Sequence, residues 1–223
     1  MDSSVPDANG SLVKALADAL DLALPPELIA AVQAAHAVPS RAYHHWGHAL
    51  AVAGQVVEAQ QRTGWARPRE ALLAALHHDA VYVPGRRDNE ARSAELALAH
   101  IAAYLPDADV DAQRVAELIR WTARHGTVTA ADLAADRQPQ DLARFMDCDM
   151  AILGADAAAF DAYDRGIAAE YRGVLPQPLF RLNRRRFLKR LLASERIFLS
   201  TDFHARLDAA ARANLRRVLT AKR

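Results

Sequence analysis

The chain has 223 residues, of which 52% are hydrophobic and 25% are charged, with a formal net charge of +1 at pH 7. This length and composition predict one soluble folded domain and exclude both an intrinsically disordered chain and a polytopic membrane protein. The only cysteine, Cys148, excludes a disulfide framework, and the N-terminus lacks the basic and apolar segments of a secretion signal. We therefore expect a cytoplasmic protein.

Charge is distributed unevenly along the chain. Residues 1–180 carry 15 Lys and Arg against 24 Asp and Glu, net −9, whereas residues 181–223 carry 13 against 3, net +10. The basic residues near the C-terminus alternate with apolar ones, as they do on the wet side of an amphipathic helix. We therefore expect Arg181 to Arg190 to face solvent or the acidic part of the protein, and we expect neither a nucleic-acid nor a membrane partner.

Helix-forming residues dominate every segment, and no segment shows the alternation of a β-strand. The sequence predicts an all-α fold, a single-domain helical bundle. Prolines and glycines divide it into about nine predicted helices, with breaks at Pro25–Pro26, Pro39, Pro68, Pro84–Gly85, Pro106, Gly126, Gly154 and Pro176. Pro84 to Asp88 is predicted to be a loop, with Asp88 as the N-cap of the next helix.

The first histidine cluster lies in the segment YHHWGH, which contains His44, His45 and His48. If this segment is helical, His44 and His48 lie one turn apart, about 6 Å along the axis, and share a face. This spacing suits two ligands of one metal ion. An ordinary polar pair has the same spacing, so both interpretations stay open.

The second cluster follows an apolar run, Ala71 to Leu76, which predicts a buried helix ending in His77, His78 and Asp79. Polar groups at the inner end of a core helix need partners, because leaving each one unpaired costs about 1 to 3 kcal/mol. A histidine and an aspartate that satisfy each other would meet this need, and so would a shared metal ion.

Two further carboxylates, Asp147 and Asp149, lie far downstream in the apolar segment FMDCDMAILG. Such buried carboxylates also need partners. One histidine of the first cluster, the doublet of the second and one of these aspartates would form a mixed nitrogen and oxygen donor set. Such a set suits Mn²⁺, Fe²⁺, Co²⁺, Ni²⁺ or Zn²⁺.

This order of residues resembles the HD superfamily of metal-dependent phosphohydrolases, in which a histidine, a His-Asp doublet and a later aspartate lie on helices. The matching positions are His48, His78, Asp79 and Asp149, which leaves Asp147 outside the ligand set. The likeness is closer to one bacterial branch, whose further segments correspond to RAYH (41–44), DNEARSA (88–94), TARH (122–125), ERIFLSTDF (195–203) and ARANL (211–215).

The resemblance covers the chain from about Pro39 to Leu215. It implies a single HD-type helical domain over residues 1–223, with a motif-bearing core at about 39–155 and C-terminal helices, 156–223, packed on it. A lone HD dipeptide would be weak support, whereas the ordered set with its additional segments is specific.

The resemblance also implies an activity: metal-dependent hydrolysis of a nucleotide or small phosphate ester by activated water, with Mn, Fe, Co, Ni, Zn or Mg as the ion. Asp79 and Glu90 would be catalytic, with Glu90 positioning or deprotonating the water. Arg41, His44 and His125 would bind the phosphorylated substrate. Each also has a structural interpretation: Arg41 pairing with a helix end, Glu90 as a first-turn acid, and His125 capping the helix before Gly126.

Two other classes of function remain open. A metal- and nucleotide-binding module would bind nucleotide tightly with little turnover. A di-iron oxygenase on the same scaffold would use His44 and His125 as additional ligands and would consume oxygen.

Overall fold

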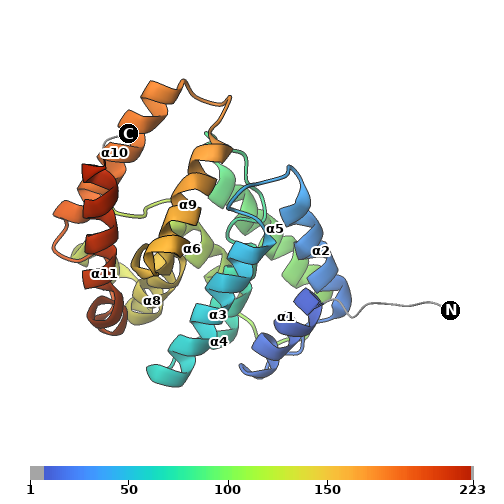
Figure 1. The fold of residues 1–223 in the computed structure, drawn as a ribbon. Coiled ribbons are helices and arrows are strands. Elements are labelled where there is room, and N and C mark those ends of the chain that lie inside the picture. The colour runs from blue at the N-terminus through green and yellow to red at the C-terminus, as the bar shows by residue number, and fades with distance from the viewer. Residues whose placement is uncertain (1–7, 222–223) are drawn as a thin grey trace.

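A computed structural model describes residues 8–221, which form eleven α-helices and one short 3-10 helix, η1, without a β-strand (Figure 1). In chain order these are α1 (Ala8–Asp18), α2 (Pro26–Ala37), α3 (Trp46–Arg62), α4 (Pro68–His77), α5 (Asn89–Tyr104), α6 (Ala112–Thr122), α7 (Ala130–Ala135), α8 (Pro139–Met150), η1 (Ala151–Gly154), α9 (Ala157–Glu170), α10 (Gln177–Ala193) and α11 (Thr201–Thr220). The all-α prediction is confirmed for these residues.

The predicted number of about nine helices is too low for the described part of the chain. One additional break lies before Pro139, which begins α8 directly after the short helix α7. The other lies between α10 and α11, where residues 194–200 contain neither glycine nor proline. The carboxylates of Asp147 in α8 and Asp208 in α11 accept amide hydrogen bonds there, so the chain turns without a local breaker.

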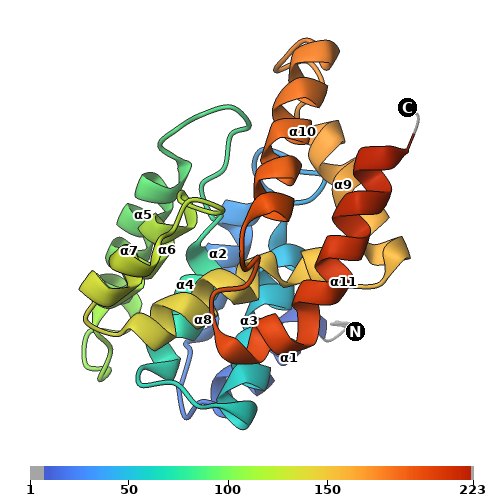
Figure 2. The same ribbon diagram turned by 90° about the vertical axis from the view of Figure 1, so that its left-hand side faces the viewer.

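Helix α4 is the centre of the molecule, and α3, α5, α6 and α8 all pack against it. Its apolar run, Ala71 to Leu76, is buried on every side, as the sequence predicted. One connected set of buried apolar side chains includes residues from α1 through α11. In Figure 2, α9, α10 and α11 lie together on one side of this core, while α5, α6 and α7 form another side.

A buried carboxylate joins the start of α4 to α8. Asp141 accepts hydrogen bonds from the amides of Ala66 and Arg67, at 3.1 and 2.9 Å, just before Pro68 opens α4. Proline suits this first helical position because its missing N–H would have no helical partner. The contact fixes the position of α8 relative to α4.

The basic segment of α10 is mostly exposed, as expected: Arg181, Arg185, Arg186, Lys189 and Arg190 face solvent. Arg184 is the exception and pairs with Asp164 of α9 at 3.2 Å. Within residues 8–221, no helix combines the length and the apolar character that crossing a membrane requires.

Candidate metal centre

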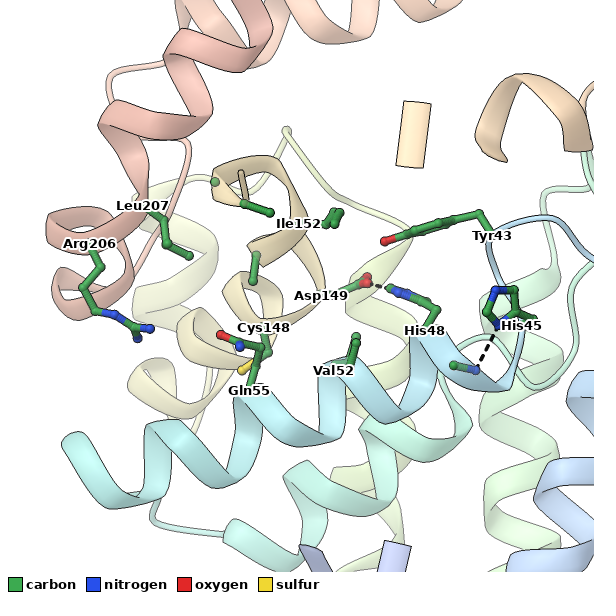
Figure 3. Close-up of a pocket in the computed structure, with 15 residues that line it drawn as sticks. Tyr43, His45, His48, Val52, Gln55, Cys148, Asp149, Ile152, Arg206 and Leu207 are labelled. Atoms are coloured by element: carbon green, nitrogen blue, oxygen red, sulfur yellow. Dashed lines mark hydrogen bonds and ion pairs between the residues drawn. The ribbon is translucent and has the colours of Figure 1, made fainter. Parts of the chain in front are cut away.

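Four of the predicted site residues converge at the inner ends of three elements. His48 comes from the first turn of α3, His78 and Asp79 follow the last turn of α4, and Asp149 comes from the last turn of α8. The His48 Nε2 atom lies 3.0 Å from Asp149 Oδ1 (Figure 3). It lies 3.1 Å from His78 Nε2. Donor atoms of His48, His78 and Asp149 all lie within 4.8 Å of one another, so these three side chains could hold a metal ion.

Asp79 lies next to both histidines of this group. Its Oδ2 lies 3.1 Å from His78 Nε2 and 3.5 Å from His48 Nε2. Bonds of about 2.0 to 2.2 Å to one ion would separate neighbouring donor atoms by about 2.8 to 3.6 Å at angles between 90° and 109°. The separation between the two histidine nitrogens and those from them to the carboxylate oxygens fall within that interval, and imidazole and carboxylate donors suit a divalent transition metal.

The backbone fixes the orientation of the His78 ring. His78 Nδ1 donates to the carbonyl oxygen of Ala75 at 2.9 Å, so Nε2 is the ring nitrogen that faces Asp79 and Asp149. Histidines that bind metals commonly donate their other N–H to a backbone carbonyl in this way, which sets the tautomer. The last turn of α4 therefore presents His78 Nε2 to the donor cluster.

Arg41 holds the backbone around Asp79. Its guanidinium donates to the carbonyl oxygens of Asp79 and Ala80, and also to those of Ala35 and His44. It does not line the cavity beside the donor cluster. These contacts match the structural interpretation of Arg41, in which it pairs with a helix end: carbonyl oxygens, which attract a cation there, take up the guanidinium.

The DNEARSA segment fixes the same loop from the other side. Asn89 and Ser93, one turn apart on α5, exchange hydrogen bonds with the backbone of Val83 and Val81 respectively. Asp88 occupies the N-cap position, but its side chain pairs with Arg86 at 2.6 Å instead of capping the helix. The loop after the His-Asp doublet is thus tied to the first two turns of α5.

A cavity of about 270 Å³, called the polar cavity below, opens onto the donor cluster. Glu90 and His125 line it together with His48, Asp79 and Asp149. His125 Nε2 lies 2.7 Å from Asp149 Oδ2, whereas His48 contacts the other carboxylate oxygen, Oδ1. Burial, with the charges of Asp79 and Asp149, raises the pKa of Glu90.

His44 lines the polar cavity but is not on the helix, contrary to the sequence-based expectation. Helix α3 begins at Trp46, because His45 is its N-cap, in an extended conformation with its side chain accepting from the amide of Gly47. Glu170 Oε1 accepts the amide hydrogens of Tyr43 and His44, which precede the helix. The other oxygen, Oε2, lies 2.6 Å from His44 Nδ1. Burial opposes protonation of His44, but Asp79 and Glu170 outweigh it and raise the pKa of the imidazole.

The electrostatics of the cluster reflect these contacts. Burial disfavours charge on every member, yet His78, His125 and His48 together hold the pKa of Asp149 well below its ordinary value. The pKa of Asp79 is likewise lowered, mainly by His78. Both carboxylates are therefore ionised at neutral pH, which is the form that binds a cation.

Asp147 points away from the cluster and anchors the start of α11. Its carboxylate accepts hydrogen bonds from the amides of Leu199 and Ser200, each at 2.7 Å, and from the Ser200 hydroxyl at 2.6 Å. Cys148, between the two aspartates, is buried, and burial raises the pKa of its thiol well above the ordinary value.

We expect Asp147→Ala to lower the free energy of unfolding by about 2 to 4 kcal/mol, since two partly buried amides and a hydroxyl lose their acceptor. Metal retention is expected to be unchanged. Chemical denaturation and metal analysis of the same preparation would measure both quantities, with Asp109→Ala, an exposed position, as control. Loss of metal from folded Asp147→Ala would contradict the assignment of Asp149.

Among the residues that sequence reasoning missed, Tyr82, Tyr163 and Arg184 line the polar cavity, and Glu170 holds His44. Tyr82 stacks on His44 with ring centroids 4.1 Å apart, and Arg184 lies over the Tyr163 ring at 4.9 Å. Glu170 is 126 residues from His44 and lies in an ordinary amphipathic helix, so no local signal marked it. Arg184 was grouped with the solvated basic face.

Comparison with known proteins adds no relative to this description. No family model, curated protein or solved structure matches the chain.

Proposed function

We propose that the protein is a metal-dependent phosphohydrolase of the HD type that acts on a small phosphate monoester. One observation carries this proposal: His48, His78 and Asp149 bring donor atoms within 4.8 Å of one another, with Asp79 next to both histidines, beside a cavity that also contains Glu90, His44 and His125. An ordinary buried polar pair needs neither four donors nor a cavity.

These four residues would hold the ion. A divalent ion supplies two effects there: it lowers the pKa of a water molecule and polarises a phosphoryl oxygen. The chain's own groups supply the rest. Glu90, whose pKa is raised by burial, accepts the proton of the attacking water. His44, kept protonated and oriented by Glu170, donates a hydrogen bond to the phosphate, and Arg184 adds positive charge to the cavity.

Metal analysis of the protein purified without chelators, followed by a phosphate-release panel of nucleotides and phosphomonoesters with Mn²⁺, tests the proposal. We expect bound metal and release of inorganic phosphate from at least one monoester. Tight nucleotide binding without turnover would instead support the binding module, and oxygen uptake by the iron-loaded protein would support the oxygenase. Protein that retains no divalent metal would overturn the proposal.

Metal affinity is expected to rise with pH. Burial disfavours a charge on His78, but Asp79 and Asp149 outweigh it and raise the pKa of this imidazole well above its ordinary value. Below that pKa an ion must displace a proton, so the apparent association constant should rise about tenfold per pH unit. Competition with a chelator between pH 6 and pH 8 measures the slope, and a pH-independent constant would contradict this account.

A further inference from the structure

A second cavity, of about 430 Å³, also reaches the donor cluster (Figure 3). Its walls come from α3, from the end of α8 with η1, and from α11. Tyr43, His48, Asp149 and Ile152 line both this cavity and the polar cavity, so the two spaces meet at the candidate metal centre. We call the second space the apolar cavity.

The lining of the apolar cavity offers few polar partners. Small and aliphatic side chains form most of it: Ala51, Val52, Ala151, Ile152, Ala155 and Leu207. The polar side chains at its edge are already hydrogen bonded, Arg206 to Asp202 and Glu58, Gln55 to Glu58, and His45 to the amide of Gly47. A sugar hydroxyl placed against the small and aliphatic side chains would lose its hydrogen bonds to water without finding replacements among them.

We propose that the apolar cavity receives the organic group of the substrate, and that this group is an uncharged aliphatic chain. The inference rests on the proposed function, because it takes the phosphate to lie beside the donor cluster. The polar cavity is the smaller of the two and contains the groups that would bind the phosphate, His44, His125 and Arg184. A chain leaving the phosphate past Tyr43 and Ile152 enters the larger, apolar space.

Chain length provides the measurable consequence. Each methylene group moved from water into an apolar site strengthens binding about fourfold. Alkylphosphonates are suitable probes because their P–C bond is not hydrolysed, so binding is observed without turnover. Butylphosphonate and hexylphosphonate differ by two methylene groups, and we expect the Mn²⁺-loaded protein to bind the longer one more than tenfold tighter by titration calorimetry. Methylphosphonate provides the reference for the phosphate end.

Two leucine variants locate the chain. Ala51 is exposed on α3 and lines the apolar cavity, so Ala51→Leu fills part of that space with a good helix former. It should abolish the gain from chain length and leave methylphosphonate binding unchanged. Ala99→Leu, at an exposed position on α5 that lines neither cavity, should keep the gain. Ala155→Leu narrows the same cavity from the end of η1 and should repeat the effect of Ala51→Leu.

The outcomes separate this inference from the proposed function. Equal affinity for methyl-, butyl- and hexylphosphonate would show that the organic group lies elsewhere and would overturn the inference alone. An undiminished gain in both Ala51→Leu and Ala155→Leu would overturn it as well. If Mn²⁺-loaded protein bound none of the three phosphonates, the phosphoryl site itself would be absent, and the proposed function would fail together with the inference.

Discussion

Replacing Asp79 with alanine is expected to abolish both metal retention and phosphate-ester hydrolysis. Asp79 is buried, with 8% of its surface exposed, and its Oδ2 lies close to both histidine nitrogens of the cluster. A buried cation depends on the charge of such carboxylates, because water cannot replace them at that depth. Arg41 holds the backbone carbonyl of Asp79, so the loop keeps its shape when the side chain is removed.

Metal content after dialysis, compared with phosphate release, measures this effect. Asp149→Ala should behave in the same way, whereas Asp147→Ala is the matched control two residues away with its carboxylate turned to α11. A folded Asp79→Ala protein with a full complement of metal would refute the role of Asp79. If Asp147→Ala lost the metal and Asp149→Ala kept it, the ligand assignment would be displaced by two residues.

Glu90→Gln is expected to keep the metal and lower kcat by about 100-fold or more. Glutamine preserves the size of the side chain in the polar cavity but cannot accept a proton. Burial raises the pKa of Glu90, so hydrolysis by the unmodified protein should fall as the pH drops through that pKa and Glu90 becomes protonated. The variant should lack this dependence.

The matched control is Glu95→Gln, at an exposed position on the same helix, which should leave kcat unchanged. His125→Ala should also keep the metal and lower turnover, since its contact is with the second oxygen of Asp149. Steady-state kinetics across a pH series distinguishes these cases. Unchanged kcat in Glu90→Gln would exclude proton transfer by this residue.

Local sequence patterns predicted the parts of the site that depend on one helix. The apolar run of α4 identified a buried helix, and the doublet His78–Asp79 marked its inner end. The ordered motif also selected Asp149 over Asp147, and in the structure Asp149 joins the donor cluster while Asp147 binds the start of α11.

Features that depend on contacts between distant segments were not predictable in this way. His44 lies before the N-cap of α3 and binds Glu170, which is 126 residues away, so a helical pattern in YHHWGH was misleading. Arg41 has the charge expected of a residue that binds phosphate. Only the fold shows that its guanidinium already donates hydrogen bonds to backbone carbonyl oxygens. The sequence places Arg184 in a basic helix, whereas the structure shows that Arg184 lines the polar cavity.

Cys148 is the only thiol of the chain, and because it is buried, its reaction with thiol reagents reports on opening of the folded structure. Thiol reagents attack the thiolate, and both the raised pKa and the 1% exposure of Cys148 make that form scarce and inaccessible in the folded protein. Its rate of modification therefore measures how often the structure around the end of α8 opens. A cysteine introduced at an exposed position such as Ala51 could be labelled selectively without first removing the native one.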